Sequence, residues 1–338
     1  MNFYKYNVLS IYSGREALCL IRILIILTAV VSFMNGFTDA PNSLSNSVMT
    51  RAISPKAAVS VGAAMNFLGA CASMLIGRSV VLSLSELFGT QNVSQSTGCV
   101  MLCCSLLTVI LLAAVAWYFG IPTSESHALS AAAAGASLAA TGGVSLSGCI
   151  PVVSGLFLSL AVGFIGGFIS AKIAVTLFKN TNNDLSQKVF RKTQIFFCIL
   201  CSFMHGVQDG AKLSAVMGFC IVSPLLSTAF VAAVMSVGTL FGAGRIMKRV
   251  GEGFGKLKPY AGAGADIGTF VSLFICTALG MPVSTSHVKT AALCGAAAER
   301  SMKRVRWNNA LSMTLAWLIT FPFCFICSYV MTAVIVCG

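Results

Sequence analysis

A six-residue pattern, P-x-S-x-S-H, occurs at residues 122–127 and again at residues 282–287, 160 residues further along the chain. Hydroxyl side chains directly after a proline fall in the first turn of a helix, where backbone N–H groups have no intrahelical partner. Such a helix start carries a partial positive charge and is suited to hold an oxyanion. The hydroxyl-bearing candidates are Ser124, Ser126, Ser284, Thr285 and Ser286.

A second duplicated pattern, G-x-x-D, ends in Asp39 and in Asp209, 170 residues apart. Two carboxylates would repel a bare anion, so they favour a cation or a proton that is bound beside it. The opposite charges would then offset each other's desolvation inside a membrane. A structural role, as caps of broken helices, is the alternative, but the duplication at matched positions favours a functional role.

All three histidines of the chain, His127, His205 and His287, lie in these four motifs. Each imidazole could relay a proton, contact the substrate, or be a hydrogen-bonded core residue that fixes a hairpin. The serines likewise could be polar contacts between helices. Asp266 has no counterpart in the other half, and we interpret it as a helix-packing or boundary residue.

The elements around these motifs are strongly apolar. The mean hydropathy is +0.89, and only 9% of the 338 residues are charged, which excludes an ordinary soluble domain. The net charge of +13 is concentrated in short loops, a pattern that membrane topology explains better than nucleic-acid binding. The 14 cysteines lie mostly inside apolar runs, so neither a zinc site nor redox chemistry is expected.

Ten apolar stretches are candidates for membrane segments. Loops rich in Lys and Arg should lie inside, and residues 79–95, 142–149 and 218–224, which lack both, should lie outside. Five segments per half then make the second half enter the membrane from the opposite side, with both termini outside. The segments are roughly 20–48, 57–78, 96–120, 122–142, 149–178, 193–218, 224–245, 261–280, 282–299 and 309–336.

The sequence thus predicts an all-α integral membrane protein with two inverted-topology repeats. Residues 35–54 and 205–224 carry too many polar groups for plain spanning helices, so each should be broken. The two P-x-S-x-S-H segments run into small residues and should form broken or re-entrant hairpins whose helix ends point into a buried cavity. The predicted units are an N-terminal segment (1–19), a first repeat (20–178), a cytoplasmic linker (179–192) and a second repeat (193–338).

The motifs, their order and the inverted duplication resemble the inorganic phosphate transporter (PiT) family over nearly the whole chain, from about residue 20 onward. The first motif of that family reads close to G-A-N-D-x-A-N-A. Residues 36–43 keep its Asp and its second Asn, here Asn42, but have Thr38 in place of its first Asn.

The second copy, residues 205–212, resembles the H-G-x-N-D-G-x-K form of that motif, with Gln208 in place of its Asn and with Lys212 at its end. The hairpin motifs resemble the family's P-x-S-T-[ST]-H, with Glu125 in place of the usual Thr in the first half. By this resemblance, the substrate and ion site would include Asp39, Asn42, Ser124, Ser126, Asp209, Ser284, Thr285 and Ser286.

The departures from the family's pattern bear on the coupling ion. In the family, sodium can bind among such oxygens, here near Asp39, Asn42 and Asp209. Oxygen ligands lost at positions 38 and 212 weaken a symmetric pair of sodium sites, and the ammonium of Lys212 could replace one cation or contact phosphate. Glu125 is then a candidate proton acceptor with Lys289 as its partner. These features favour a proton over sodium, and both ions stay open.

The resemblance implies a symporter of inorganic phosphate in the cytoplasmic membrane, driven by H⁺ or Na⁺ and working by alternating access, without a cofactor or an enzymatic step. The expected partners are phosphate, the coupling cation and the lipid bilayer, with a homodimer left open. The alternatives are a transporter of another oxyanion such as sulfate, a channel, and a membrane-embedded metalloenzyme built from the His and Asp residues. Against the metalloenzyme, the sequence has no H-E-x-x-H motif.

Overall fold

The computed structural model describes residues 15–119, 124–221, 223–254, 257–305 and 307–337, and the regular structure among them is entirely helical. Its helices are α2 (Arg15–Thr38), α3 (Ala40–Met49), α4 (Pro55–Ala72), α5 (Arg78–Phe88), η1 (Thr90–Asn92), α6 (Gln95–Phe119), α7 (Glu125–Thr141), α8 (Leu146–Leu177), α9 (Asn183–Met217), α10 (Pro224–Phe254), α11 (Pro259–Ala278), α12 (Thr285–Ala298), η2 (Met302–Arg304) and α13 (Trp307–Cys337).

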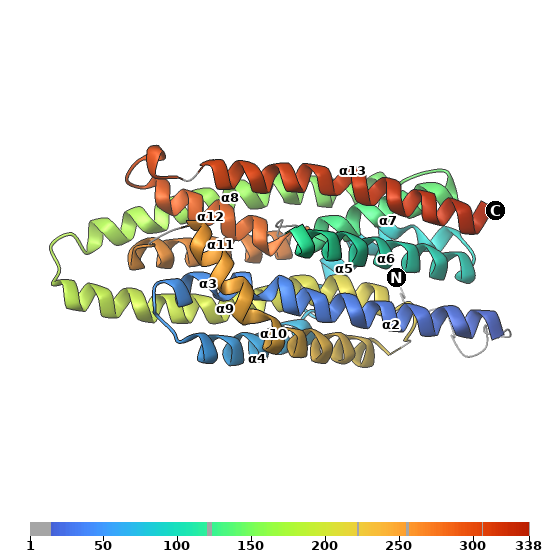
Figure 1. Cartoon of the computed structure of the whole chain (residues 1–338), viewed down its shortest axis with the longest axis horizontal. Coiled ribbons are helices and arrows are strands. Elements are labelled where there is room, and N and C mark those ends of the chain that lie inside the picture. The colour runs from blue at the N-terminus through green and yellow to red at the C-terminus, as the bar shows by residue number, and fades with distance from the viewer. Residues whose placement is uncertain (1–14, 120–123, 222, 255–256, 306, 338) are drawn as a thin grey trace.

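The helices form an elongated bundle whose long helices run along its length (Figure 1). Six stretches in the described residues are long and apolar enough to cross a membrane. Large apolar side chains such as Phe157, Phe241 and Val334 are more than half exposed, as expected for a surface that faces lipid. The chain is therefore a multi-pass membrane protein, while the predicted count of ten segments stays a prediction.

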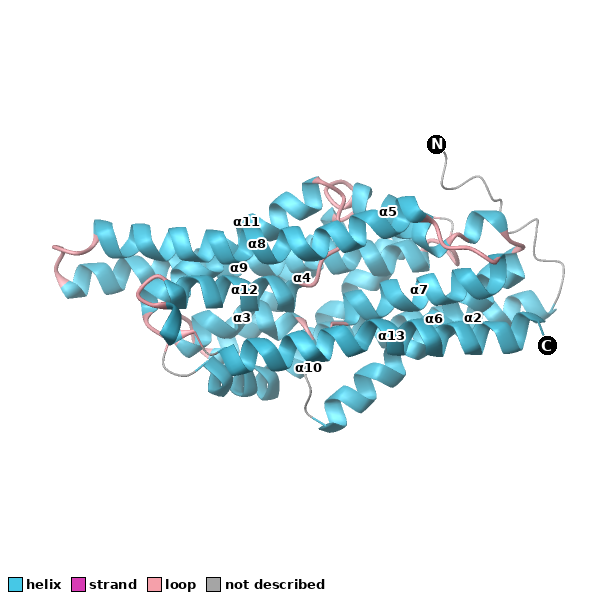
Figure 2. Cartoon of the chain, turned by 90° about the horizontal axis from the view of Figure 1, so that it is seen from above, coloured by secondary structure: helices cyan, strands magenta, loops and turns pink. Residues whose placement is uncertain are grey.

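The two short helices that begin in the P-x-S-x-S-H motifs lie toward opposite ends of the bundle. Helices α6 and α7 occupy one end and α11 and α12 the other, in both views (Figures 1 and 2). Helix α12 has 14 residues, a length of roughly 21 Å at the usual helical rise, which is shorter than the hydrocarbon core. This arrangement agrees with re-entrant hairpins. The inverted relation of the two halves stays a prediction.

The predicted break in the first polar segment occurs at Asp39, between the end of α2 and the start of α3. Pro41, in the first turn of α3, has no N–H to donate and fits the start of a new helix. The break is one residue long, because Asp39 keeps a near-helical backbone and its N–H still donates to the carbonyl of Asn35 at 2.9 Å.

The corresponding prediction for the second polar segment is wrong, because α9 continues without a break from Asn183 to Met217. The glycines of this segment serve close packing rather than a break. A Cβ on Gly206 would lie 2.4 Å from the carbonyl oxygen of Asn66, and one on Gly210 would lie 2.7 Å from Cα of Ala70. Helix α9 therefore packs directly on the backbone of α4.

The predicted outer loop at 79–95 needs correction, and the predicted linker gains detail. Residues 79–95, predicted as an outer loop, contain most of α5, whose Val80, Leu84 and Leu87 form a buried stripe at helical spacing. The predicted linker 179–192 is mostly helical, because Asn182 caps the start of α9 by accepting a hydrogen bond from the backbone N–H of Asp184 at 3.0 Å. The predicted N-terminal segment lies outside the described residues up to residue 14, and its remainder is in α2.

Candidate functional site

Asp209 is the centre of a buried polar cluster to which three helices contribute. Its Oδ1 accepts hydrogen bonds from Lys212 Nζ at 2.6 Å and from Ser126 Oγ at 3.3 Å. Its Oδ2 accepts one from Asn35 Nδ2 at 3.1 Å and lies 3.1 Å from His205 Nε2. Only 1% of Asp209 is exposed, so these contacts replace the hydration of the carboxylate. The cluster joins α9 to α2 and α7.

Lys212 connects this cluster to the starts of both short helices. Besides Asp209, its ammonium donates to Ser126 Oγ at 2.6 Å and to the backbone carbonyl of Val283 at 2.5 Å. An ammonium has three hydrogens to donate, and here each of them has an acceptor. The residue that the sequence singled out as a built-in cation is thus fully paired, between the N-terminal ends of α7 and α12.

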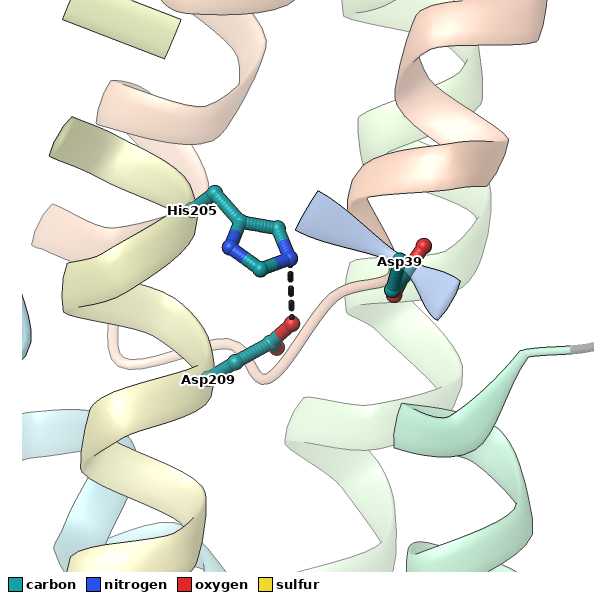
Figure 3. Close-up of side chains that lie close together, drawn as sticks. All are labelled: Asp39, His205 and Asp209. Carbon is teal, nitrogen blue, oxygen red and sulfur yellow. Dashed lines mark ion pairs between the residues drawn. The ribbon is translucent and has the colours of Figure 1, made fainter. Parts of the chain in front are cut away.

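Asp39 lies across from this pair, at the break between α2 and α3. Its Oδ1 accepts a hydrogen bond from Asn42 Nδ2 at 2.8 Å, and its buried Oδ2 has no hydrogen-bond partner among the described residues. Three possible ligand atoms lie within 4.8 Å of one another here, one each from Asp39, His205 and Asp209 (Figure 3). Two carboxylates and an imidazole at this spacing could hold a cation.

A chain of hydrogen bonds orients His205. Thr239 Oγ1 donates to the carbonyl of Met235 at 3.0 Å and accepts from Asn66 Nδ2 at 3.0 Å. The other amide atom of Asn66, Oδ1, therefore faces His205 Nδ1 at 2.9 Å and must accept its hydrogen. This leaves Nε2 directed at Asp209. The sequence motifs did not reveal that Asn66 and Thr239 hold His205 in this orientation.

Glu125 is the first residue of α7 and is buried. Its Oε1 is in hydrogen-bond contact with Thr38 Oγ1. The predicted pairing of Glu125 with Lys289 is wrong. The Nζ of Lys289 lies 2.5 Å from Asp266 Oδ1 and 3.3 Å from the carbonyl oxygen of Ser43. Residue 289 lies in the second turn of α12, against α11 and α3, and so it is directed away from α7.

Asp266 belongs to a second buried cluster, so our interpretation of it as a packing or boundary residue was incomplete. In addition to Lys289, it accepts a hydrogen bond from Asn46 Nδ2 at 2.8 Å, and it lies 3.3 Å from Ser47 Oγ. A signal was present in the sequence. Lys289 lies in an apolar helix and needs an anionic partner, and the chain has only nine acidic residues in which to find one.

The hydroxyl groups of the two hairpin motifs have different surroundings. Ser124 caps its own helix, since its Oγ accepts a hydrogen bond from the backbone N–H of His127 at 3.2 Å. Ser284 and Ser286 have their hydroxyl oxygens 2.9 Å apart. Thr285 Oγ1 is buried, and no described residue provides it with a hydrogen-bond partner. The structure therefore brings Ser126 into the Asp209 cluster and leaves Thr285 with an unused donor. Pro122 and Thr123 lie outside the described residues.

The two hairpin histidines meet each other. The rings of His127 and His287 have their centroids 4.5 Å apart, and Phe321 of α13 lies 5.0 Å from His127 on another side. The two rings are tilted by 48°, and neither ring nitrogen of His127 has a hydrogen-bond partner among the described residues, so the roles predicted for these two histidines stay predictions. His205, in contrast, has its Nε2 3.1 Å from Oδ2 of Asp209.

A small cavity of about 10 Å³ lies within the cluster, with room for no more than about one water molecule. The site is therefore closed around its own side chains in this conformation. The cavity is lined by Val31, Asn35, Glu125, Ser126, Leu129, Asp209, Lys212 and Leu213.

Comparison with known proteins gives consistent matches. The model of the phosphate transporter family matches residues 35–328. A probable low-affinity inorganic phosphate transporter of Bacillus subtilis is 33% identical over 320 residues, which cover 91% of this chain and 95% of that protein. One from Rhizobium meliloti is 33% identical over 314 residues, covering 88% and 91%. A solved structure described as the sodium-dependent phosphate transporter has a TM-score of 0.82 at 20% identity, covering 94% of this chain and 99% of that one, a likeness of fold alone.

Proposed function

The chain belongs to the phosphate transporter family, and from this premise we propose that it carries inorganic phosphate across the cytoplasmic membrane together with a cation. Membership confirms the resemblance seen in the motifs. It also places the chain in a class of transporters rather than enzymes, so the metalloenzyme alternative is set aside.

One observation supports phosphate binding most strongly: Lys212 Nζ lies between the N-terminal ends of α7 and α12, bonded to Ser126 and to the carbonyl of Val283. Helix N-termini, an ammonium and hydroxyl donors are the groups that bind phosphate oxygens in proteins. We place the phosphate here, with Thr285 as a further donor. Because the present cavity is too small for it, Lys212 must exchange some of its protein acceptors for phosphate oxygens as the site opens.

The cation is best supported at Asp39. Its Oδ2 is buried without a hydrogen-bond partner in the described part of the chain, whereas Lys212 already neutralises Asp209. A buried carboxylate needs a compensating charge or a proton. The name of the solved neighbour reports sodium dependence of that protein, which supports sodium here, with Asn42 and Asp209 near enough to contribute.

Alternating access needs two arrangements of elements around one site. We propose that the repeats at residues 20–178 and 193–338 provide them, with both termini outside. The opposite placement of the α6–α7 and α11–α12 pairs supports this topology (Figure 2), as does the absence of Lys and Arg from residues 79–95, 142–149 and 218–224.

Radiolabelled phosphate uptake into proteoliposomes tests the substrate and the coupling together, with sodium and proton gradients imposed separately. Excess unlabelled phosphate or arsenate should abolish uptake, and sulfate at the same concentration should leave it unchanged. Equal competition by sulfate would contradict the phosphate assignment and support a transporter of broader oxyanion specificity. Uptake driven by neither gradient would contradict cation coupling.

A further inference from the structure

We propose that Glu125 carries a coupling proton through the transport cycle, with the hydroxyl of Thr38 as its acceptor in the protonated state. This inference rests on the proposed cation-coupled transport and names one of its cations. It concerns the buried carboxyl group of Glu125, which contacts the hydroxyl of Thr38.

The hydrogen atoms around Thr38 can be counted. Its hydroxyl has one hydrogen, and its Oγ1 lies 2.7 Å from the carbonyl oxygen of Met34, which can only accept. A Thr inside a helix commonly donates to the carbonyl four residues earlier. The same hydroxyl is also placed to donate to Glu125 Oε1, so one hydrogen serves two acceptors. A proton on Glu125 would give each of the two contacts a hydrogen of its own.

The charges around Glu125 favour the same protonation state. The groups that face it include Asn35 and Thr38 from α2 and, from its own helix, Ser126. The titratable groups near Glu125 are Asp39 at the helix break, and Asp209 and Lys212 on α9. His205 lies beside Asp209. The rings of His127 and His287 lie next to each other in the two hairpin motifs. Because Lys212 is already paired with Asp209, an ionised Glu125 would be a second buried carboxylate, besides Asp39, with no cation among the described residues.

Side chains from two different motifs thus contact each other. Thr38 belongs to the first G-x-x-D motif and Glu125 to the first P-x-S-x-S-H motif, 87 residues apart in sequence. The same small cavity is lined by Glu125, Ser126 and Lys212. A proton on Glu125 is therefore next to the place where the phosphate is proposed to bind.

In the cycle that follows, the Glu125 carboxylate takes a proton from water on the side with the higher proton activity, when the site is open there. The neutral carboxyl group donates to Thr38 while the site is closed. When the site opens to the other side, water hydrates the carboxyl group and accepts the proton. On uptake, an O–H bond of hydronium breaks as one forms on Glu125, and on release the Glu125 O–H bond breaks as one forms on water, so one proton crosses in each cycle.

The test uses the full-length chain in proteoliposomes and compares two measurements. Glu125→Gln keeps the shape of a neutral carboxyl group but cannot release a proton. Phosphate exchange between equal phosphate pools at equal pH needs no net proton movement, so this variant should lower exchange much less than it lowers accumulation. An inward gradient of one pH unit can concentrate phosphate about tenfold through coupling to one proton, and this accumulation should be lost. Glu86→Gln, which changes an exposed acidic residue of α5, serves as the matched control and should behave as wild type.

A second variant keeps the carboxyl group and removes its acceptor. Thr38→Val should move the pH of half-maximal uptake to lower values by up to about one unit, the effect of one hydrogen bond. The sign follows because the protonated form alone loses a partner, so a higher proton activity is needed to populate it. Thr38→Ser retains the hydroxyl and should keep the wild-type profile.

The outcomes separate this inference from the proposed function. Wild-type protein that fails to transport phosphate would contradict the function itself. Wild-type uptake that responds to sodium alone, or accumulation on a pH gradient by Glu125→Gln, would overturn the proton role and leave phosphate transport intact. If Glu125→Gln does not fold, as judged by gel filtration in detergent, the Thr38→Val profile decides, and an unchanged profile overturns the proposal.

Discussion

In the first copy of the G-x-x-D motif, Asp39 lies at the break between α2 and α3, whereas in the second copy Asp209 lies inside the continuous helix α9. The residue three positions further on donates to the carboxylate in both copies, at 2.8 Å from Asn42 and at 2.6 Å from Lys212. The position of the donor relative to the carboxylate is thus the same in both copies, but the donor is neutral in the first and positively charged in the second. Lys212 thus pairs with the second carboxylate, whereas we propose that the first carboxylate binds an external cation.

The backbone differs for a local reason. Pro41 follows Asp39 by two residues, and the matching position after Asp209 is Ala211. Proline cannot donate a backbone hydrogen bond and disfavours the helical conformation of the residue before it, while alanine continues a helix readily. The same motif thus lies at a helix break in one half and inside a continuous helix in the other.

The largest effects should come from removing either carboxylate. Asp39→Asn and Asp209→Asn should each abolish phosphate uptake while protein remains in the membrane. They should differ in stability, because Asp209→Asn leaves the Lys212 ammonium buried without an anion, at a cost of about 3–5 kcal/mol. Thermal unfolding in detergent should show a lowered midpoint for Asp209→Asn and a near-normal one for Asp39→Asn.

The double variant Asp209→Asn, Lys212→Met is the control for that difference. It removes both charges together and should recover most of the lost thermal stability without recovering transport. Normal uptake by either single variant would show that its carboxylate is not needed, and equal midpoints would contradict the contrast between the two copies.

An intermediate effect is expected from Lys212→Asn, which gives the second copy the residue of the first. Asp209 then needs an external cation, so uptake should gain sodium dependence, and uptake driven by a pH gradient alone should fall. Initial rates measured with each gradient imposed separately would show the change. Rates and ion dependence that match wild type would rule out Lys212 as a built-in cation.

The smallest effect should come from Asn42→Ala, which removes a neutral donor from Asp39. One such hydrogen bond contributes about 0.5–1.5 kcal/mol, so the apparent affinity for the coupling cation should change by no more than about tenfold. Titration of phosphate uptake against the cation concentration measures this shift. A complete loss of uptake would mean that Asn42 is a direct ligand rather than a support for the carboxylate.

Features that depend on neighbours in sequence were predictable. Pro41 and Asp39 marked the helix break, and the hydroxyls at Ser124 and Ser284 marked the starts of α7 and α12. The buried stripe of α5 was equally readable, from Val80, Leu84 and Leu87, and was missed because the segment is short and lies between apolar spans. Capping, proline geometry and helical periodicity act over a few residues, so one sequence contains the information.

The partners of the buried charges were decided by the tertiary structure alone. Asn46 reaches Asp266 across 220 residues, and Thr38 reaches Glu125 across 87. Whether Lys289 would pair with Glu125 or Asp266 depended on which face of α12 met α11. The sequence by itself determined that every charge buried in this membrane protein needs a partner, because an unpaired charge there is too costly. Only the packing of the helices decided which partner each one has.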